Sequence, residues 1–444
     1  MGNEGRQIFI KYVSFNVFGM LALSLYYVVD TIFIAQALGR EGLASLNYAI
    51  PLFGVVHASG LMIGVGGAIR YNVFKSQHQQ QKANHIFTST LLLGGVISLV
   101  YIALGLFFHE SLTRFLGATQ GDKAFMMTAS YIRIVLVFSP LYVLSNILIA
   151  FIRNDGVPSI AMGGLLVASF FNITFDYVLL FVIPLGMLGA AIASSIGAFF
   201  GLMTLSLFFI LKKNTVQLGH LKGFLTLWPV ILVLGLPASL IDFSYSIVMS
   251  FFNHLLTIIE GITAVAAYSI IANLSLLSLA VFIGISQGVQ PLLTQAYSLK
   301  DDIVLTKILK ASALLIVFLS FAIYGLLFVF SDAVVALFNQ DQDMRLAIIA
   351  KEGIRIYFIG LFFAGLNILY SAFYGAIEQP RLGLLIVLLR GLILVIPIGF
   401  LLSNLFGVVG VWFAFVAAES LTLVIAYLIF FIKATKRRQF LRAS

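Results

Sequence analysis

Residues 172–194 read NITFDYVLLFVIPLGMLGAAIAS, and this stretch decides how the chain is built. Most of its side chains are apolar enough for a membrane core, but Asn172, Asp176 and Ser194 lie among them. A carboxylate inside a membrane is costly, so Asp176 marks a candidate functional site. The stretch therefore predicts two membrane-spanning helices, joined by residues 184–186, that carry a polar site.

The composition of the whole chain is that of a membrane protein. Of its 444 residues, 61% are hydrophobic and 10% are charged, and the mean hydropathy is +1.08. Soluble domains average about 45–50% apolar and about 25% charged residues. The chain contains no cysteine, which excludes disulfides, thiolate metal sites and cysteine nucleophiles. We therefore expect a polytopic membrane protein.

Twelve apolar segments are long enough to cross a membrane, which takes about 20 residues. Their length favours α-helices over barrel strands of about 10 residues. No cleavage-site pattern of small residues follows the first segment, so we expect an uncleaved first span. The sequence thus predicts an all-α polytopic membrane protein. The predicted spans are residues 9–37, 45–72, 84–108, 125–150, 159–183, 187–211, 228–257, 263–291, 306–330, 345–374, 381–402 and 408–432.

Basic residues are distributed unevenly over the loops between these spans. An even number of spans puts both termini on one side, and most of the 26 Lys and Arg residues, Lys75 and Arg153 included, fall on that side. Basic loops are typical of the cytoplasmic face, so we expect both termini in the cytoplasm. This topology explains the net charge of +9 without a nucleic-acid partner. The exceptions are Arg40, Arg114, Lys123, Arg133, Arg345, Lys351 and Arg355.

The two halves of the chain resemble each other at an offset of about 220 residues. The matching segments are EGLASLNYAI (41–50) with EGITAVAAYSI (260–270), YIRI (131–134) with GIRI (353–356), NIL (146–148) with NIL (367–369), and LGMLGAAIA (185–193) with FGVVGVWFA (406–414). Their order and register predict two six-helix lobes, residues 1–216 and 217–444. Because each repeat has six spans, a pseudo-two-fold axis along the membrane normal should relate the lobes. Two such lobes suit a transporter that works by rocking alternating access.

Four polar residues of the first lobe are predicted to lie at similar depth. Asp30, Asp176 and Ser194 are each about seven residues from the outer end of their helix, or about 10 Å below the surface. Asn172 lies one turn before Asp176 on the same helix face. Their oxygens suit a hard cation such as Na⁺, and two carboxylates in one dry site can instead share a proton. We therefore expect Asp30, Asn172, Asp176 and Ser194 to hold a coupling ion. The alternative is that these groups only satisfy one another or the backbone.

Other deep charged residues have other interpretations. Arg390 and Glu419 lie at comparable depth on adjacent spans, and we interpret them as a buried structural ion pair. Asp242, in the middle of span seven, is a candidate for a substrate site or a second coupling site. The six histidines show no HExxH pattern and the chain has no GxxxxGK[ST] phosphate loop. We expect no enzymatic activity and no cofactor, with Na⁺ or H⁺ as the coupling ion.

The chain resembles the multidrug and toxic compound extrusion (MATE) transporters over nearly its whole length. The resemblance rests on the twelve spans, the repeat and the segments VVDTIFIAQALG (28–39), NITFDYVLLFVIPLGMLGAAIAS (172–194), FIRNDGVPSIAM (151–162) and SQGVQPLLTQAYS (286–298). It implies efflux of small organic, often cationic compounds in exchange for Na⁺ or H⁺.

The resemblance also implies a cation site. In one branch of the family this site is made by an Asp of span one, an Asn and an Asp four apart in span five, and a Thr of span six. These positions match Asp30, Asn172, Asp176 and Ser194, where serine keeps the hydroxyl. Tyr177 departs from the proline that often follows the span-five Asp. Another branch has acidic coupling residues in spans seven and ten, and span ten here lacks a deep carboxylate.

These observations together predict a monomeric multidrug antiporter in the cell (plasma) membrane, in contact with lipids and small organic substrates. The main alternative is a flippase for lipid-linked saccharides or other lipids. A flippase should have more basic residues facing a central cavity, whereas most basic residues here are assigned to the cytoplasmic surface. A membrane-embedded enzyme would need a catalytic constellation that the chain lacks. A channel would lack saturable, gradient-driven flux.

Overall fold

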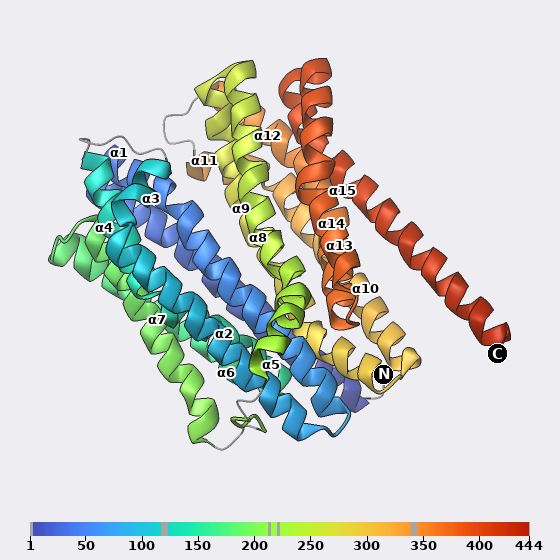
Figure 1. The fold of residues 1–444 in the computed structure, drawn as a ribbon. Helices are drawn as coiled ribbons and strands as arrows, with labels where there is room; N and C mark the ends of the chain where they lie inside the picture. The colour runs from blue at the N-terminus through green and yellow to red at the C-terminus, as the bar shows by residue number, and fades with distance from the viewer. Residues whose placement is uncertain (1–2, 117–122, 212–214, 220–222, 339–343, 444) are drawn as a thin grey trace. The chain divides into compact units, whose positions relative to one another are not determined.

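The computed structural model of the chain describes residues 3–116, 123–211, 215–219, 223–338 and 344–443 (Figure 1). Over these residues the structure is helical, with short connections and no β-strand. A helix satisfies its own backbone hydrogen bonds, which is the requirement for crossing a lipid bilayer. The predicted all-α class is confirmed.

The helices of the first half of the chain follow the predicted spans closely. Helix α1 contains the first two spans, because Gly39 breaks it with a φ of 61° and a ψ of −146°. Helices α4 and α5 meet at a 50° bend and together form one crossing. The elements are α1 (Asn3–Ser76), α2 (Gln80–Phe107), α3 (His109–Phe115), α4 (Lys123–Val137), α5 (Ser139–Asn154), α6 (Pro158–Tyr177), the π-helical η1 (Val178–Val182) and α7 (Met187–Ile210).

The second half continues in the same manner after a short connector. Its elements are the 3₁₀ turn η2 (Phe224–Leu227), α8 (Trp228–Glu260), α9 (Ile262–Ser298), α10 (Asp302–Val329), α11 (Ser331–Phe338), α12 (Met344–Tyr357), the 3₁₀ turn η3 (Phe358–Gly360), α13 (Leu361–Ala376), α14 (Pro380–Leu388), the π-helical η4 (Leu389–Ile393) and α15 (Val395–Ala443).

The number of membrane crossings agrees with the sequence. In the described chain, ten helices are long and apolar enough to cross a membrane, and the α4–α5 pair adds an eleventh crossing. One of the ten, Pro380–Leu428, covers the predicted span 381–402 and most of the predicted span 408–432. Gly407 breaks this stretch between them, with a φ of 59° and a ψ of −135°. The twelve predicted spans are therefore all present.

The backbone repeats at the same interval as the sequence. Nine residues in the described part of the chain have positive φ, and eight of them form four pairs that are 221 or 222 residues apart. The pairs are Gly39 with Gly261, His78 with Lys300, Gly156 with Glu378, and Gly186 with Gly407. Each pair marks the corresponding turn between helices in the two halves. The internal repeat is thus a property of the fold as well as of the sequence.

The chain divides into two compact units. The first comprises Met1–Phe243, Gln287–Ile308 and Gly375–Pro380, and the second comprises Ser244–Ser286, Leu309–Tyr374 and Arg381–Ser444. The first unit contains the whole first repeat together with three stretches of the second. The lobe boundary between residues 216 and 217 stays a prediction.

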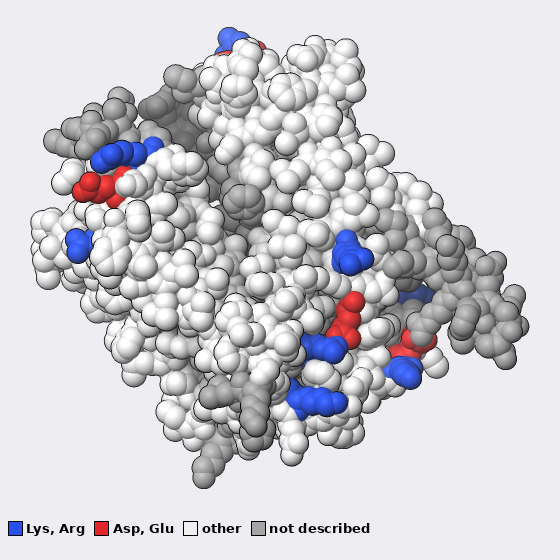
Figure 2. Space-filling model, viewed as in Figure 1, with Lys and Arg blue, Asp and Glu red and all other residues white. Residues whose placement is uncertain are grey.

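Large apolar side chains are exposed on many helices. Phe107, Phe115 and Phe318 are 77%, 87% and 67% exposed, respectively. Figure 2 shows that most of one face of the molecule carries no charged side chain. An apolar surface of this extent is typical of contact with lipid. The surface therefore supports the membrane assignment made from composition.

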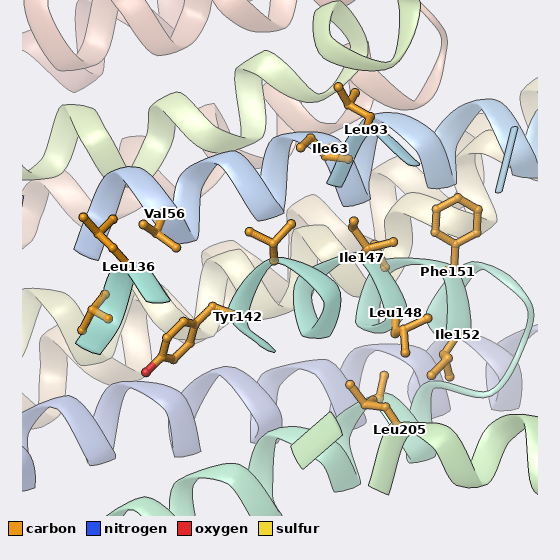
Figure 3. Close-up of a cluster of buried hydrophobic side chains, with 14 of the residues drawn as sticks. Val56, Ile63, Leu93, Leu136, Tyr142, Ile147, Leu148, Phe151, Ile152 and Leu205 are labelled. Atoms are coloured by element: carbon orange, nitrogen blue, oxygen red, sulfur yellow. The ribbon is translucent and has the colours of Figure 1, made fainter. Parts of the chain in front are cut away.

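The core of the first unit is centred on α5 (Figure 3). Ile147 points toward Ile63 of α1 and Leu93 of α2, whereas Leu148 points toward Leu205 of α7. All of these side chains are buried. Helix α5 is therefore held on two sides, and its buried Tyr142 lies at one end of the same cluster.

Glycines allow α7 to lie directly against α6. A Cβ atom at Gly197 would lie 2.6 Å from the carbonyl oxygen of Ala168, and one at Gly201 would lie 2.8 Å from the Ala168 Cβ. Distances this short do not occur without a shift of the neighbouring atoms. Small residues of this kind permit close helix packing in membranes. The close approach brings Ser194 of α7 next to Asn172 of α6.

The first prediction tests this close packing. We expect Gly197→Ala to lower the midpoint of thermal unfolding in detergent, because overpacking typically costs about 1–3 kcal/mol. Gly163→Ala on α6 is the matched control, since its Cβ would meet only the Thr204 methyl group at 3.7 Å. Both variants gain the same helix propensity, so their difference isolates packing. Equal midpoints for the two variants would contradict the close contact.

Candidate functional site

The four residues predicted to bind an ion come from three helices of the first unit. Asp30 lies on α1, Asn172 and Asp176 lie on α6, and Ser194 lies on α7. Their exposed fractions are 6%, 3%, 0% and 8%, respectively. Helix α6 changes to the π-helical turn η1 directly after Tyr177. Such turns often occur at functional sites, and this one begins two residues after Asp176.

The structure brings these residues together as two pairs. The carboxyl groups of Asp30 and Asp176 lie within hydrogen-bonding reach of each other. The Asn172 side-chain amide donates a hydrogen bond of 3.2 Å to Ser194 Oγ. Asn172 and Asp176 are one helical turn apart, so both pairs lie on the same face of α6. The structure thus places two pairs on one face of α6, and their role in binding an ion stays a prediction.

Four oxygen atoms of this group are buried without a hydrogen-bond donor. They are Asp30 Oδ1, Asn172 Oδ1 and both carboxylate oxygens of Asp176. Ionised carboxylates only accept hydrogen bonds, so neither aspartate can act as the hydrogen-bond donor that the other needs. Buried polar groups almost always have partners, and a cluster of exceptions needs an explanation. A proton or a metal cation placed among these oxygens would satisfy them.

The surroundings of the carboxylates are aromatic and do not provide a cationic side chain. Tyr131 and Tyr142 are close enough to both aspartates to interact with them electrostatically. The Tyr142 hydroxyl shares a hydrogen bond of 3.1 Å with Ser195 Oγ. In the described chain, the ion pairs of Lys and Arg involve other acidic residues. Among the described residues, no Lys or Arg side chain therefore forms an ion pair with Asp30 or Asp176.

A small cavity adjoins the site inside the first unit. It has a volume of about 80 Å³, and both Asn172 and Ser194 line it. Pockets for drug-sized ligands have volumes of about 300–1,000 Å³. The cavity is therefore large enough for an ion or water but too small for an organic drug.

Asp242, the other predicted site residue, lies in α8. Its side chain is outside the part of the chain that the structure describes. Its role in substrate binding or as a second coupling site stays a prediction.

The predicted ion pair of the second unit is present. Arg390 Nη2 donates to Glu419 Oε1 at 2.6 Å, and Arg390 Nε donates to the same oxygen at 3.0 Å. The Asn367 side-chain amide donates to Glu419 Oε2 at 2.7 Å. Glu419 is only 1% exposed, and Arg390 lies in the π-helical turn η4. Both oxygens of this carboxylate therefore have donors, in contrast to those of Asp176.

Sequence reasoning missed a further buried carboxylate of the first unit besides Asp30 and Asp176, namely Asp155. It accepts hydrogen bonds from the Tyr71 hydroxyl at 2.9 Å and from the Thr215 backbone N–H at 2.6 Å. It also contacts the Lys75 ammonium group and the Thr215 hydroxyl. Asp155 thus joins the end of α5, the end of α1 and the start of the connector. The only sequence signal was a carboxylate in the short loop between the predicted spans 125–150 and 159–183.

The connector between the two repeats is bound to α2. Asn84 accepts a hydrogen bond of 3.1 Å from the Gln217 backbone N–H, and Thr88 Oγ1 accepts one of 2.7 Å from the Gly219 N–H. Gln80 donates to the Thr215 carbonyl oxygen at 2.8 Å. Residues 215–219 are therefore an ordered strap on the first unit rather than a free linker.

Arg153 is buried, although the sequence placed it with the cytoplasmic surface residues. The residue is only 1% exposed. Its Nη1 donates hydrogen bonds to Asn16 Oδ1 at 3.1 Å and to Gln287 Oε1 at 2.7 Å. Two side-chain amides, one from α1 and one from α9, replace water around the guanidinium group. The surface assignment of Arg153 was wrong because these partners lie far away in sequence.

Comparison with known proteins identifies the family. The MatE family model matches residues 16–178 and 237–401, which is one match in each repeat. The chain is 23% identical over 437 residues to the multidrug export protein MepA of Staphylococcus saprophyticus, covering 97% of this chain and 95% of that protein. It is 26% identical over 428 residues to MepA of Staphylococcus aureus strain MSSA476, covering 93% and 91%.

Solved structures share the fold. One is the outward-facing conformation of a multidrug resistance MATE family transporter of the MOP superfamily, with a TM-score of 0.91, 20% identity and coverage of 97% of this chain and 96% of that chain. Another is MATE in complex with MaL6, with a TM-score of 0.90, 20% identity and 97% coverage of each chain. The family match in both repeats thus defines a multi-pass membrane transport protein rather than an enzyme. The chain belongs to the MatE family.

The second prediction concerns Asp155. We expect Asp155→Asn to lower the unfolding midpoint, because weakening several buried hydrogen bonds to a charged group costs about 1–3 kcal/mol. Glu110→Gln is the matched control, since Glu110 and its partner Arg114 are more than half exposed. Exposed pairs contribute only about 0–1 kcal/mol. If both variants unfold at the wild-type midpoint, Asp155 does not hold the connector in place.

Proposed function

We propose that this protein is a secondary active antiporter that exports small organic, often cationic compounds in exchange for Na⁺ or H⁺. The observation that carries the proposal is the group of four buried acceptor oxygens without donors on α1 and α6. A bound cation would satisfy them and compensate the charge of Asp30 and Asp176. The relatives that are multidrug export proteins support organic compounds as the substrate class.

The chemistry of the group favours a hard monovalent cation. A single proton shared by Asp30 and Asp176 supplies one donor and leaves Asn172 Oδ1 without a partner. Na⁺ can be bound by carboxylate, amide and hydroxyl oxygens together, so Ser194 Oγ and Asn172 Oδ1 would complete its ligands. Asn172 Oδ1 is therefore the atom that favours Na⁺ over H⁺.

Ion binding would couple to conformation because its ligands come from separate helices. A cation drives a change only if it binds one conformation more tightly than the other. Binding draws Asp30 of α1 and Asp176 of α6 together, and release allows their charges to repel. A conformation that separates these helices therefore loses affinity for the ion.

Contacts at one end of the first unit would have to break during rocking. Asn72 donates to the Pro291 carbonyl oxygen at 2.9 Å, and Arg70 forms an ion pair with Glu378 at 2.5 Å. Together with the Arg153–Gln287 hydrogen bond, these contacts join α1 and α5 to stretches of the second repeat. We interpret them as the closed cytoplasmic gate of an alternating-access cycle.

The proposed orientation places this gate and both termini in the cytoplasm, with the protein in the plasma membrane. The basic residues Arg70, Lys75 and Arg153 all lie at the gate end, as the positive-inside rule requires. Because the ion site is complete within one chain, we propose that the monomer, surrounded by lipid, is the functional unit. Asp242 is proposed as a substrate or second coupling site.

The third prediction tests the proposed coupling. Asp176→Asn keeps the side-chain volume but removes a negative charge, so we expect gradient-driven ethidium efflux from proteoliposomes to fall by about 5–150-fold, the range of typical coupling free energies. A Na⁺ gradient and a pH gradient are imposed separately, and the effective one names the ion. Glu352→Gln, which removes an exposed carboxylate of α12, is the control and should transport normally. Undiminished efflux by Asp176→Asn would contradict the proposal.

A further inference from the structure

The small cavity of the first unit extends away from the ion site in one direction. From Asn172 its wall follows α6 through Ser169 to Gly164, and from Ser194 it follows α7 to Leu205. Eight residues of α6 correspond to about 12 Å along the helix axis. Helix α6 begins at Pro158, so the cavity runs toward the end of the unit that contains the proposed gate.

The cavity wall is polar along much of this length. Ser169 of α6, Ser145 and Asn146 of α5, and His57 of α1 line it between Asn172 and its far end. Ser145 Oγ is buried and has no hydrogen-bond partner, so it needs a partner from within the cavity. Burying an unpaired hydroxyl costs about 1–3 kcal/mol. Because Ser145 also lines the cavity, a water molecule or an ion there could supply the missing partner, which is not so for the equally unpaired Ser139.

Small residues make room for the passage, and one large residue closes it. Gly164 and Gly201 lie where α6 and α7 approach each other. A Cβ at Gly164 would lie 2.6 Å from Leu205 Cδ2, so the Leu205 side chain fills the space at this end. Leu205 is 1% exposed. A change of its rotamer would extend the cavity toward the start of α6.

We propose that this cavity is the route by which the coupling cation passes between the Asp30–Asp176 pair and the gate end of the membrane, with Ser169 and Ser145 as intermediate ligands and Leu205 as the plug. This inference rests on the proposed function. The hydroxyl and amide oxygens of the wall can replace part of the water shell of Na⁺ or carry a proton through bound water. The volume of about 80 Å³ admits the cation and excludes the organic substrate. Ion and substrate therefore take separate routes.

The absence of cysteine from the chain makes this route directly testable. Single variants Ser145→Cys and Ser169→Cys are treated in sealed vesicles with Ag⁺, a thiol-reactive monovalent cation similar in size to Na⁺. Ser139→Cys is the matched control, because Ser139 lies on α5, is 0% exposed and does not line the cavity. Gln77→Cys, in the exposed turn after α1, reports which membrane face is at the gate end.

The fourth prediction is the pattern of thiol modification. From the gate end, Ag⁺ should modify Ser169→Cys and Ser145→Cys at least about tenfold faster than Ser139→Cys. Saturating Na⁺ should slow both reactions. Adding Leu205→Ala to Ser169→Cys should accelerate modification further, whereas Leu207→Ala, at an exposed position on α7, should not.

Two results would overturn the route. One is modification of Ser169→Cys no faster than that of Ser139→Cys, with or without Leu205→Ala. The other is modification only from the face opposite to that of Gln77→Cys.

Measuring ethidium efflux by Asp176→Asn distinguishes a failure of this route from a failure of the proposed coupling site. If that variant loses coupling while Ser169→Cys stays unreactive, the ion site stands and the route fails. If it transports normally while Ser169→Cys reacts from the gate end, the passage stands and the coupling site fails.

Discussion

The candidate site of the first unit depends on four acceptor oxygens that are buried without hydrogen-bond donors. They belong to Asp30, Asn172 and Asp176, and each would cost several kcal/mol in a lipid environment without a partner. The surrounding structure holds them in place rather than satisfying them. Glycines of α7 permit the contact with α6, a π-helical turn follows Asp176, and the buried Tyr131 and Tyr142 lie near both aspartates. The proposed coupling ion would supply the partner that these oxygens lack, which is the property that an ion-driven switch needs.

The two repeats share a backbone but not a charge distribution. At an offset of 221 or 222 residues, the partners of Asp30 and Asp176 are Phe252 and Pro397, so the second repeat has no equivalent carboxylates. Its own buried carboxylate, Glu419, is fully satisfied by Arg390 and Asn367. Among the described residues, the first repeat therefore has two buried carboxylates without an ion-pair partner, Asp30 and Asp176. The second repeat has a buried carboxylate, Glu419, whose charge is compensated by Arg390. Ion binding at Asp30 and Asp176 would consequently act on the first repeat, and the role of Asp242 in the second repeat stays a proposal.

Local patterns made most of the fold, and the depth of the candidate site residues, predictable from the sequence. A membrane-spanning helix satisfies its own backbone, so its position depends on a continuous apolar segment. Depth along such a helix follows from a residue count, which is why the sequence could place Asp30, Asp176 and Ser194 at similar depth. In the structure Asp30 lies next to Asp176, and Ser194 contacts Asn172. Each continuous apolar segment forms its own helix, so the kinks at Gly39 and Gly407 fall between predicted spans.

The polar contacts at the gate end were not predictable in this way. The donors to Asp155 lie 60 and 84 residues away, and Gln287 lies 134 residues from Arg153. A basic residue at the end of a span is equally compatible with a cytoplasmic surface and with a buried network. Only the packing of distant segments decides between them, and the same is true of the cavity along α6 and α7.

The most direct test of the account is the equilibrium binding of cations to the purified protein, with ²²Na⁺ uptake and proton release measured on the same sample. The account predicts saturable cation binding by the wild type that is lost in the double variant Asp30→Asn/Asp176→Asn, while the variant remains folded. Cation binding by the double variant equal to that of the wild type would contradict the claim that these buried oxygens hold the coupling ion.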